Sequence, residues 1–331
     1  MCIRDRNDSA QFQHRGLIGD SGVPPEAEAA AKAVRRETGF PVGWLVAPSA
    51  VWLLLFLVIP LVSIIAFSFW SAEIGKLDTS VTLKNYANFF HHEGFFDSQA
   101  DRFLTMGVFL KTLWNTFRYT LEVMALCLLV GYPIAYFLAM RIQTFKWQMA
   151  LFLLCMVPFW TSYLIRAVAW IPMLGRRGLL NKFLVNTGIV DKPVDFLLYS
   201  EFGYTMALVQ LYVVLSVGPI FFSLAKIDKT IIEAARDMGA KTYQIFWEII
   251  LPLSLPGVAI GMVFIFVMIM GEFATAVVVY GGKTSTVGTV ILNYYAVADY
   301  PFAAVNAIML MLAMMIGVVI ILRLVNIRKE L

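Results

Sequence analysis

Six long apolar stretches, separated by polar segments, dominate the pattern along the chain. They cover approximately residues 44–70, 117–140, 149–174, 204–225, 255–280 and 302–325. Each is close to or above the roughly 20 mostly apolar residues that a helix needs to cross a hydrocarbon core about 30 Å thick. Several contain proline, which membrane helices tolerate when neighbouring groups satisfy the freed carbonyls. The pattern therefore predicts an all-α, polytopic membrane protein with six transmembrane helices.

The composition strengthens this prediction. Hydrophobic residues make up 60% of the 331 residues and charged residues 15%, against roughly 45–50% and 25% in soluble domains. The net charge of +4 comes from charges that lie between the apolar stretches and form no basic face. We therefore expect the lipid bilayer as environment and no nucleic-acid partner. Cysteine and histidine show no metal-ligand spacing, so neither a metal nor another cofactor is expected.

The beginning of the chain differs from the rest. Residues 1–43 contain two adjacent prolines, a run of Ala and Glu and six Lys/Arg, without an apolar period. Such a composition is typical of disorder. We expect a disordered cytoplasmic tail at 1–43 and a transmembrane domain at 44–327.

The Lys and Arg residues predict the orientation. With the tail inside, the inner segments hold 15 of them and the outer segments nine. The positive-inside rule then favours a multi-pass protein with both termini in the cytoplasm. One loop opposes the rule, because four basic residues lie in the supposedly external segment 175–203.

The segment between the fourth and fifth stretches, residues 226–258, has the most informative polar pattern. Asp228 is suited to an N-cap and Gly239 to a left-handed C-terminal cap of a short helix. One face of this helix is small or apolar at helical spacing: Ile231, Ala234, Ala235 and Met238. A second amphipathic turn follows, and Pro252 and Pro256 are expected to redirect the backbone into the fifth span. The residues leave two interpretations open, an L-shaped helix pair that fits a socket in a partner protein and an amphipathic helix resting on lipid.

This segment resembles the EAA signature of permeases in bacterial, binding-protein-dependent ABC importers with a MetI-like transmembrane domain. The signature reads Glu-Ala-Ala, three residues, Gly, nine residues and Ile-x-Leu-Pro. Every position and spacing agrees in this chain: Glu233, Ala234, Ala235, Gly239, Ile249, Leu251 and Pro252. The resemblance covers about residues 44–327.

The resemblance implies a role and a set of partners. In that family the loop, here 226–254, docks into a cytoplasmic ATPase subunit and carries its ATP-driven closure to the membrane helices. The seven signature residues would therefore be ATPase-coupling residues. The implied partners are an ABC ATPase dimer, a second permease subunit that is usually a different chain, and an extracytoplasmic solute-binding protein. The implied location is the bacterial inner membrane.

The chain itself is not expected to be an enzyme. Residues 281–284 read Gly-Gly-Lys-Thr like the end of a P-loop, but Val277 stands where its first glycine belongs, and the segment leaves a membrane span. No catalytic triad, zinc-protease motif or carboxylate pair occurs in a plausible arrangement. We expect no catalytic residues here and ATP hydrolysis in the partner.

Ionisable residues within membrane spans are costly and are candidates for function. There are four: Arg118, Glu122, Arg166 and Glu272. Arg118 and Glu122 are four residues apart on one helix face, so a structural ion pair competes with a place for Glu122 in the substrate pathway. Arg166 either faces water at the external mouth or packs between helices. Glu272 is likewise divided between substrate pathway and packing.

The surroundings of Glu272 bear on the substrate. Gly271-Glu272-Phe273 with the later Gly-Gly-Lys-Thr resembles a stretch of the spermidine/putrescine branch of these permeases, and residues 131–136 and 165–181 resemble other patterns of that branch. Residues 276–280 depart from it. A carboxylate in a partly dehydrated pathway favours a cation. Three tyrosines either add cation–π contacts or form an interfacial belt: Tyr294, Tyr295 and Tyr300.

We therefore expect a permease subunit of an ABC importer, most simply for a polyamine. Related permeases carry opines, betaines, thiamine, metals or oxyanions, and these remain alternatives. A rival from another class is an ion-coupled secondary transporter with Glu122 or Glu272 as its proton site. That rival predicts inverted repeats, which the sequence does not show, and leaves the EAA signature unexplained.

Overall fold

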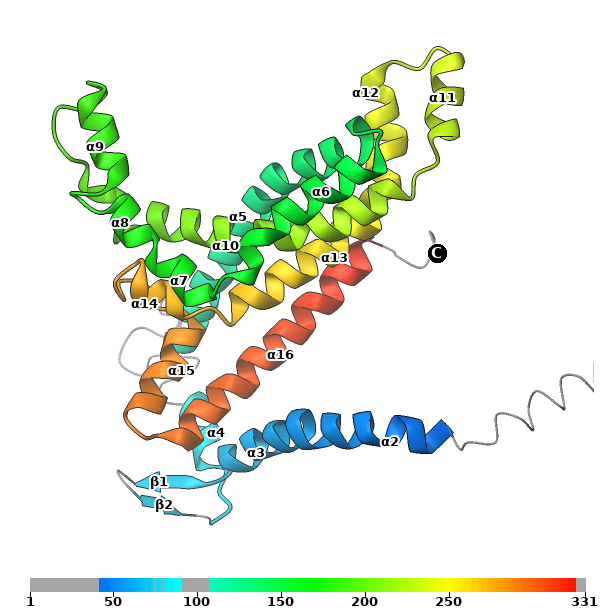
Figure 1. Ribbon diagram of the computed structural model, residues 1–331. Coiled ribbons are helices and arrows are strands. Elements are labelled where there is room, and N and C mark those ends of the chain that lie inside the picture. Colours follow the sequence, from blue (N-terminus) through cyan, green and yellow to red (C-terminus); the bar gives the residue numbers. More distant parts are fainter. Residues whose placement is uncertain (1–41, 74–75, 79, 91–106, 326–331) are drawn as a thin grey trace, which may run out of the picture. The chain divides into compact units, whose positions relative to one another are not determined.

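A computed structural model describes residues 42–73, 76–78, 80–90 and 107–325 of the chain (Figure 1). The chain forms two compact units, Met1–Ser63 and Ile64–Leu331. The tail predicted at 1–43 falls almost entirely outside the described residues.

The first predicted span is a long helix. α2 (Val42–Leu53) continues through one π-helical turn, η1 (Leu54–Val58), into α3 (Ile59–Ser68). The wider π turn directly precedes Pro60, where an α-helical turn would bring the proline ring against a carbonyl. Val46–Ser68 is long and apolar enough to cross a membrane, as the apolar pattern predicts.

The second unit is built around three packed helices. These are α5 (Val108–Tyr136), which continues through η3 (Phe137–Arg141), α10 (Glu201–Ala225) and α13 (Leu251–Met270). Fully buried side chains from all three meet in one cluster that includes Val123, Leu208 and Ile265. α16 (Tyr300–Val325) packs against α13, with Phe266 and Val305 in a shared cluster. Burial of these apolar faces against one another places the core at the centre of the bundle.

Close approach of α10 and α13 depends on small residues. A Cβ atom at Gly257 would lie 2.5 Å from the carbonyl oxygen of Pro219, and one at Gly261 would lie 3.0 Å from Cα of Ser216. Helices in membranes associate mainly through such tight packing, because lipid tails are as apolar as the side chains.

The third span is broken, and the expectation of one continuous helix over 149–174 is wrong. α6 (Phe145–Met156) and η4 (Val157–Trp160) end at Thr161, and the chain restarts in α7 (Tyr163–Val168), α8 (Trp170–Leu174) and α9 (Leu179–Asn186). The two halves are bent by 88°. Pro158 lacks the amide that would continue the ladder, and Thr161 and Ser162 are extended.

The fifth span begins and ends earlier than 255–280. α12 (Thr242–Gln244) runs through the π-helical η6 (Ile245–Ile250) into α13, so Pro252 and Pro256 do not redirect the backbone. Pro252 lies near the start of α13, directly after the π turn, where its missing amide is tolerated. The helix ends at Met270, and a separate short helix, α14 (Ala274–Val278), follows the break. Within the described residues, five helices and one bent pair can cross a membrane, which agrees with six spans.

The remaining elements connect these helices. β1 (Ser71–Glu73) and β2 (Lys76–Asp78) form a small antiparallel hairpin, which the apolar pattern does not predict, and α4 (Lys84–Asn88) follows it. η5 (Asp195–Leu197) precedes α10, α11 (Lys229–Asp237) follows it, and α15 (Val287–Ala296) precedes α16. Figure 1 shows α9 and α11 at opposite ends of the helix bundle.

Candidate functional site

The short helix α11 is closed at both ends as the sequence predicts. The Asp228 carboxylate accepts a hydrogen bond of 3.0 Å from the Thr230 amide, and this bond holds the pKa of Asp228 below its ordinary value. Gly239 adopts φ +86°, and the amides of Gly239 and Ala240 donate to the carbonyls of Arg236 and Ala235. This pair of bonds around a left-handed residue is the Schellman arrangement. α11 is thus a rigid, well-bounded element.

The two faces of α11 have different surroundings. Ile232 and Ala235 are buried and pack in a cluster with Ile245 and Ile250 of η6. Glu233 and Ala234 are exposed on the other face, and Met238 is 83% exposed. The expected small face is therefore divided, with one alanine facing inward and the other outward.

The signature residues serve two positions in this arrangement. Glu233, Ala234 and Gly239 lie on exposed parts of α11 and its cap. Ile249 and Leu251 pack against the cluster that holds α11 to the base of α13, and Pro252 is half-buried beside them. The signature thus joins an exposed helix to the start of a long apolar helix.

Glu272 lies at the break between α13 and α14 and is 5% exposed. Its carboxylate accepts hydrogen bonds from the Tyr163 hydroxyl of α7, from the Tyr212 hydroxyl of α10 at 2.6 Å and from the Thr275 amide at 2.7 Å. Its own carbonyl accepts from the Thr286 hydroxyl at 3.1 Å. These residues are called the Glu272 cluster below, and they join both broken spans.

The cluster differs from the sequence-based expectation in its partners. The hydroxyls that donate to Glu272 belong to Tyr163 and Tyr212, whereas Tyr295 and Tyr300 meet edge to face with ring centroids 5.3 Å apart. Tyr212 carries no motif and lies in the middle of an apolar helix, so no sequence signal marks it.

Arg118 and Glu122 do not form the ion pair expected from their spacing. The Arg118 guanidinium instead lies 2.7 Å from the carboxylate of Glu201, at the start of α10. Glu201 also accepts a hydrogen bond from the Tyr119 hydroxyl. An Arg that precedes Glu by four residues is the less favourable order on a helix, and the neighbouring helix offers a nearer partner. Glu122 is left exposed, with a long hydrogen bond of 3.4 Å from the Thr205 hydroxyl.

Arg166 has a buried nitrogen without a partner in the described part of the chain. Its Nη1 donates to the Leu211 carbonyl over 3.4 Å, and its buried Nε has no hydrogen-bond partner among the described residues. A pocket of about 180 Å³ lies beside it, between α7, α8 and α10.

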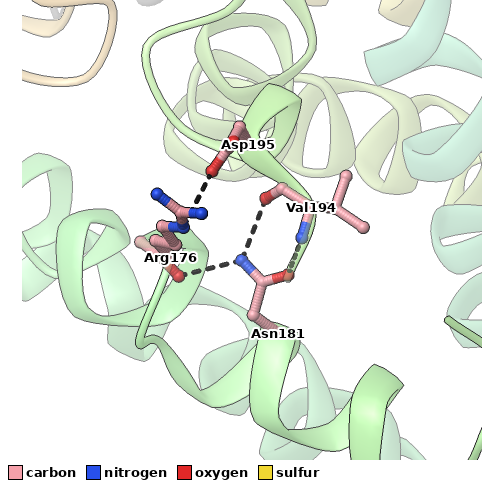
Figure 2. Close-up of polar contacts among 5 residues, drawn as sticks. Arg176, Asn181, Val194 and Asp195 are labelled. Atoms are coloured by element: carbon pink, nitrogen blue, oxygen red, sulfur yellow. Dashed lines mark hydrogen bonds and ion pairs between the residues drawn. The ribbon is translucent and has the colours of Figure 1, made fainter. Parts of the chain in front are cut away.

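The segment that carries four basic residues, between α8 and α10, is held by its own contacts (Figure 2). The buried Asn181 side chain donates to the carbonyls of Gly175 and Val194 and accepts from the Val194 amide at 2.7 Å. Arg176 forms an ion pair of 3.4 Å with Asp195. The segment between α8 and α10, which contains α9, is therefore an ordered surface element at the end of the bundle opposite α11.

Comparison with known proteins decides the family. No protein-family model matches the chain. The chain is 31% identical to the spermidine/putrescine transport system permease protein PotB of Haemophilus influenzae, over 78% of this chain and 84% of that protein. It is 32% identical to PotB of Escherichia coli, over 80% of this chain and 90% of that protein. The chain belongs to the spermidine/putrescine permease family.

The fold agrees with this membership. A chain of a bacterial alginate ABC transporter, solved in complex with an alginate pentasaccharide-bound periplasmic protein, matches with a TM-score of 0.64 at 19% identity. The match covers 90% of this chain and 97% of that chain, and at this identity it shows the fold alone. This member of the family is therefore a predominantly helical, membrane-spanning permease subunit of an ABC importer.

Proposed function

We propose that this permease forms one side of the path by which a polyamine of the spermidine/putrescine class enters a bacterial cell. Two relatives, whose matches extend over 78% and 80% of this chain, are named for these substrates. Within the structure, the observation that carries the proposal is the exposed carboxylate of Glu122 at membrane depth.

Glu122 lies near the middle of the span Phe109–Arg141. Its only hydrogen bond among the described residues is the long one from Thr205. A carboxylate in contact with lipid tails would be strongly unfavourable, so this part of α5 faces water or a polar subunit surface. In a narrow, partly dehydrated path such a carboxylate attracts an ammonium group much more strongly than it does in bulk water.

The described part of the chain does not by itself supply a complete site for a polycation. A groove of about 900 Å³ between α6, α10 and α13 is mostly apolar, and its acidic lining residue is Asp228, whose carboxylate caps α11. Glu272 is enclosed by its own donors. The remaining acidic groups of the path therefore come from a second permease subunit, and we assign Glu272 to the framework that holds the broken spans.

Import is driven from outside this chain. α11, with exposed Glu233 and Ala234, enters a cleft of a cytoplasmic ATPase dimer, and closure of that dimer moves α13 through Ile249, Leu251 and Pro252. An extracytoplasmic solute-binding protein delivers the polyamine at the end of the bundle that carries α9. This arrangement places 226–254 and both termini in the cytoplasm and the protein in the bacterial inner membrane.

Uptake by the complete transporter in proteoliposomes tests the role of Glu122. Glu122→Gln should lower polyamine uptake by about tenfold, corresponding to about 1.4 kcal/mol, and leave basal ATP hydrolysis unchanged. Glu122→Asp should retain more uptake because it keeps the charge. Unchanged uptake in Glu122→Gln would remove Glu122 from the path.

The coupling role is tested on the same preparation. Glu233→Lys reverses a charge on the exposed face of α11, and Gly239→Val forces a branched residue into φ +86°. Both should abolish uptake and the stimulation of ATP hydrolysis by the binding protein, without reducing the amount of permease in the membrane. Lys229→Ala, on the same helix, should retain both activities. Normal transport by Glu233→Lys and Gly239→Val would exclude α11 as the coupling element.

A further inference from the structure

We propose that Arg166 forms an ion pair, within the hydrocarbon core, with a carboxylate of the second permease subunit. The proposal rests on the proposed function, because it requires that this chain pairs with another permease. It assigns to Arg166 a role in assembly of the permease pair rather than in contact with the substrate.

The guanidinium has unused hydrogen-bonding capacity. An arginine side chain carries five N–H donors. Among the described residues, Nη1 donates to the Leu211 carbonyl over 3.4 Å, and the buried Nε has no hydrogen-bond partner. No carboxylate of the described part of the chain lies within 4.0 Å of it. Arg166 is half-buried, and its buried, unpartnered Nε is unfavourable unless a partner supplies an acceptor.

Two acidic residues of the described part of the chain are already engaged. The oxygens of Glu272 accept from Tyr163, Tyr212 and the Thr275 amide. Glu201 is paired with Arg118. Glu122 has only its weak bond from Thr205, but no ion pair within 4.0 Å joins it to Arg166, so the described part of the chain shows no counter-ion for Arg166.

The depth of Arg166 excludes lipid phosphate as the counter-ion. The guanidinium contacts Leu211, which is ten residues from the start of α10 and 14 residues from its end. At a rise of 1.5 Å per residue, both ends of α10 are at least about 15 Å away along the helix axis. Half the thickness of the hydrocarbon core is also about 15 Å. Phosphate groups therefore lie beyond the reach of this side chain, and a counter-ion at this depth comes from protein.

The surface around Arg166 suits a neighbouring helix. The pocket of about 180 Å³ is lined by Arg166, Ala169, Trp170, Met173 and Gln210, and it has room for the carboxyl end of one side chain. Ala169 permits close approach of a backbone. The Trp170 indole and the Gln210 amide, 3.4 Å apart, add polar groups at its rim.

Apolar side chains flank the charge on α7. Leu164, Ile165 and Val168 are 52%, 68% and 47% exposed. Apolar exposure alone would fit lipid, but an uncompensated cation in the same surface does not. Charge complementarity therefore selects a protein partner with an acidic residue at this depth, and in the proposed assembly that partner is the second permease.

Co-purification of the complete transporter tests this. With an affinity tag on this chain, Arg166→Glu should reduce the recovered second permease by at least about tenfold, since close charge pairs at interfaces are coupled by more than 1.4 kcal/mol. The amount of this chain in the membrane should stay constant. Replacing each Asp or Glu in the spans of the second permease by Arg should reveal one position that restores recovery in Arg166→Glu.

Arg118→Glu is the matched control, because its counter-ion lies within this chain. Its defect should be rescued by Glu201→Arg and by no change in the second permease. Recovery of the second permease within twofold of wild type in Arg166→Glu would overturn the inference. So would rescue from within segment 91–106, at Glu93, Asp97 or Asp101, or the absence of any rescuing position. If the unsubstituted chain recovers no second permease, the proposed function itself fails.

Discussion

At the scale of single residues, the four ionisable residues predicted within the spans differ in burial and in their partners. Glu272 keeps its carboxylate buried by collecting hydroxyl and amide donors, without a cation. Arg118 finds an acid on the next helix. Glu122 and Arg166 are the two left with weak partners in the described part of the chain. Burial and partner count, rather than presence in a span, therefore separate Glu272 and Arg118 from the two residues that we propose face the path or another subunit.

The Glu272 cluster gives a prediction about stability. Glu272→Ala leaves the Tyr212 hydroxyl and the Thr275 amide without an acceptor, at about 1–3 kcal/mol for each buried donor, whereas the Tyr163 hydroxyl still has Thr275 Oγ1 within 2.7 Å. The free energy of unfolding should fall by about 3 kcal/mol or more, while Glu272→Gln, which keeps one acceptor oxygen, should lose less. Thermal unfolding of the purified permease in detergent measures this. Glu122→Gln is the exposed comparison, and equal melting temperatures for Glu272→Ala and wild type would refute the framework role.

At the scale of elements, the cap of α11 has a predictable pH dependence. The pKa of Asp228 is lowered in the folded state by its bond to the Thr230 amide. Its contribution to helix stability is therefore complete above the unfolded-state pKa and is lost as the pH falls through the lower folded-state pKa. Amide exchange of residues 229–232 should lose protection in acid in the wild type.

Asp228→Asn separates the charge from the cap. Asparagine also caps helices well, so the variant should keep α11 formed but remove the acid-dependent step in protection. Hydrogen exchange measured by mass spectrometry, corrected for the intrinsic pH dependence of exchange, shows whether the acid-dependent step is present in the wild type and absent in Asp228→Asn. The same acid-dependent step in Asp228→Asn would show that another group controls this end of the helix.

The close contact between α10 and α13 depends on glycines, which have no side chain. A Cβ at Gly257 would lie 2.5 Å from both the Pro219 carbonyl oxygen and the Ser223 Cβ atom. Gly257→Ala should therefore separate the helices and cost about 1–3 kcal/mol through overpacking. Gly218→Ala is the control, because nothing lies within 4 Å of its Cβ position. It should be as stable as wild type or more stable, and a similar melting temperature for both variants would contradict this account.

At the scale of the whole molecule, the apolar pattern predicts the spans better than their interruptions. Runs of apolar residues reflect bilayer thickness, so all six spans are found close to where they are expected. The break at Thr161–Ser162 and the early end at Met270 depend on local backbone geometry and on contacts such as Tyr163 with Glu272, which join residues far apart in sequence.

In the candidate site, too, local features can be predicted from the sequence and contacts between helices cannot. Asp228 and Gly239 mark the ends of α11 because capping is local. The partners of Arg118 and Glu272 lie on other helices, so helical spacing within one segment does not identify them.

The separation of α9 and α11 leads to a test of orientation. Ile189, just beyond α9, is 65% exposed, and Met238, at the end of α11, is 83% exposed. In a background in which the three native cysteines are replaced, Ile189→Cys and Met238→Cys place one thiol at each end. A membrane-impermeant maleimide added to spheroplasts should label Ile189→Cys and leave Met238→Cys unlabelled until the membrane is opened. Because the docking of an ATPase requires α11 inside, labelling of Met238→Cys in sealed spheroplasts would invalidate the orientation and the coupling role together.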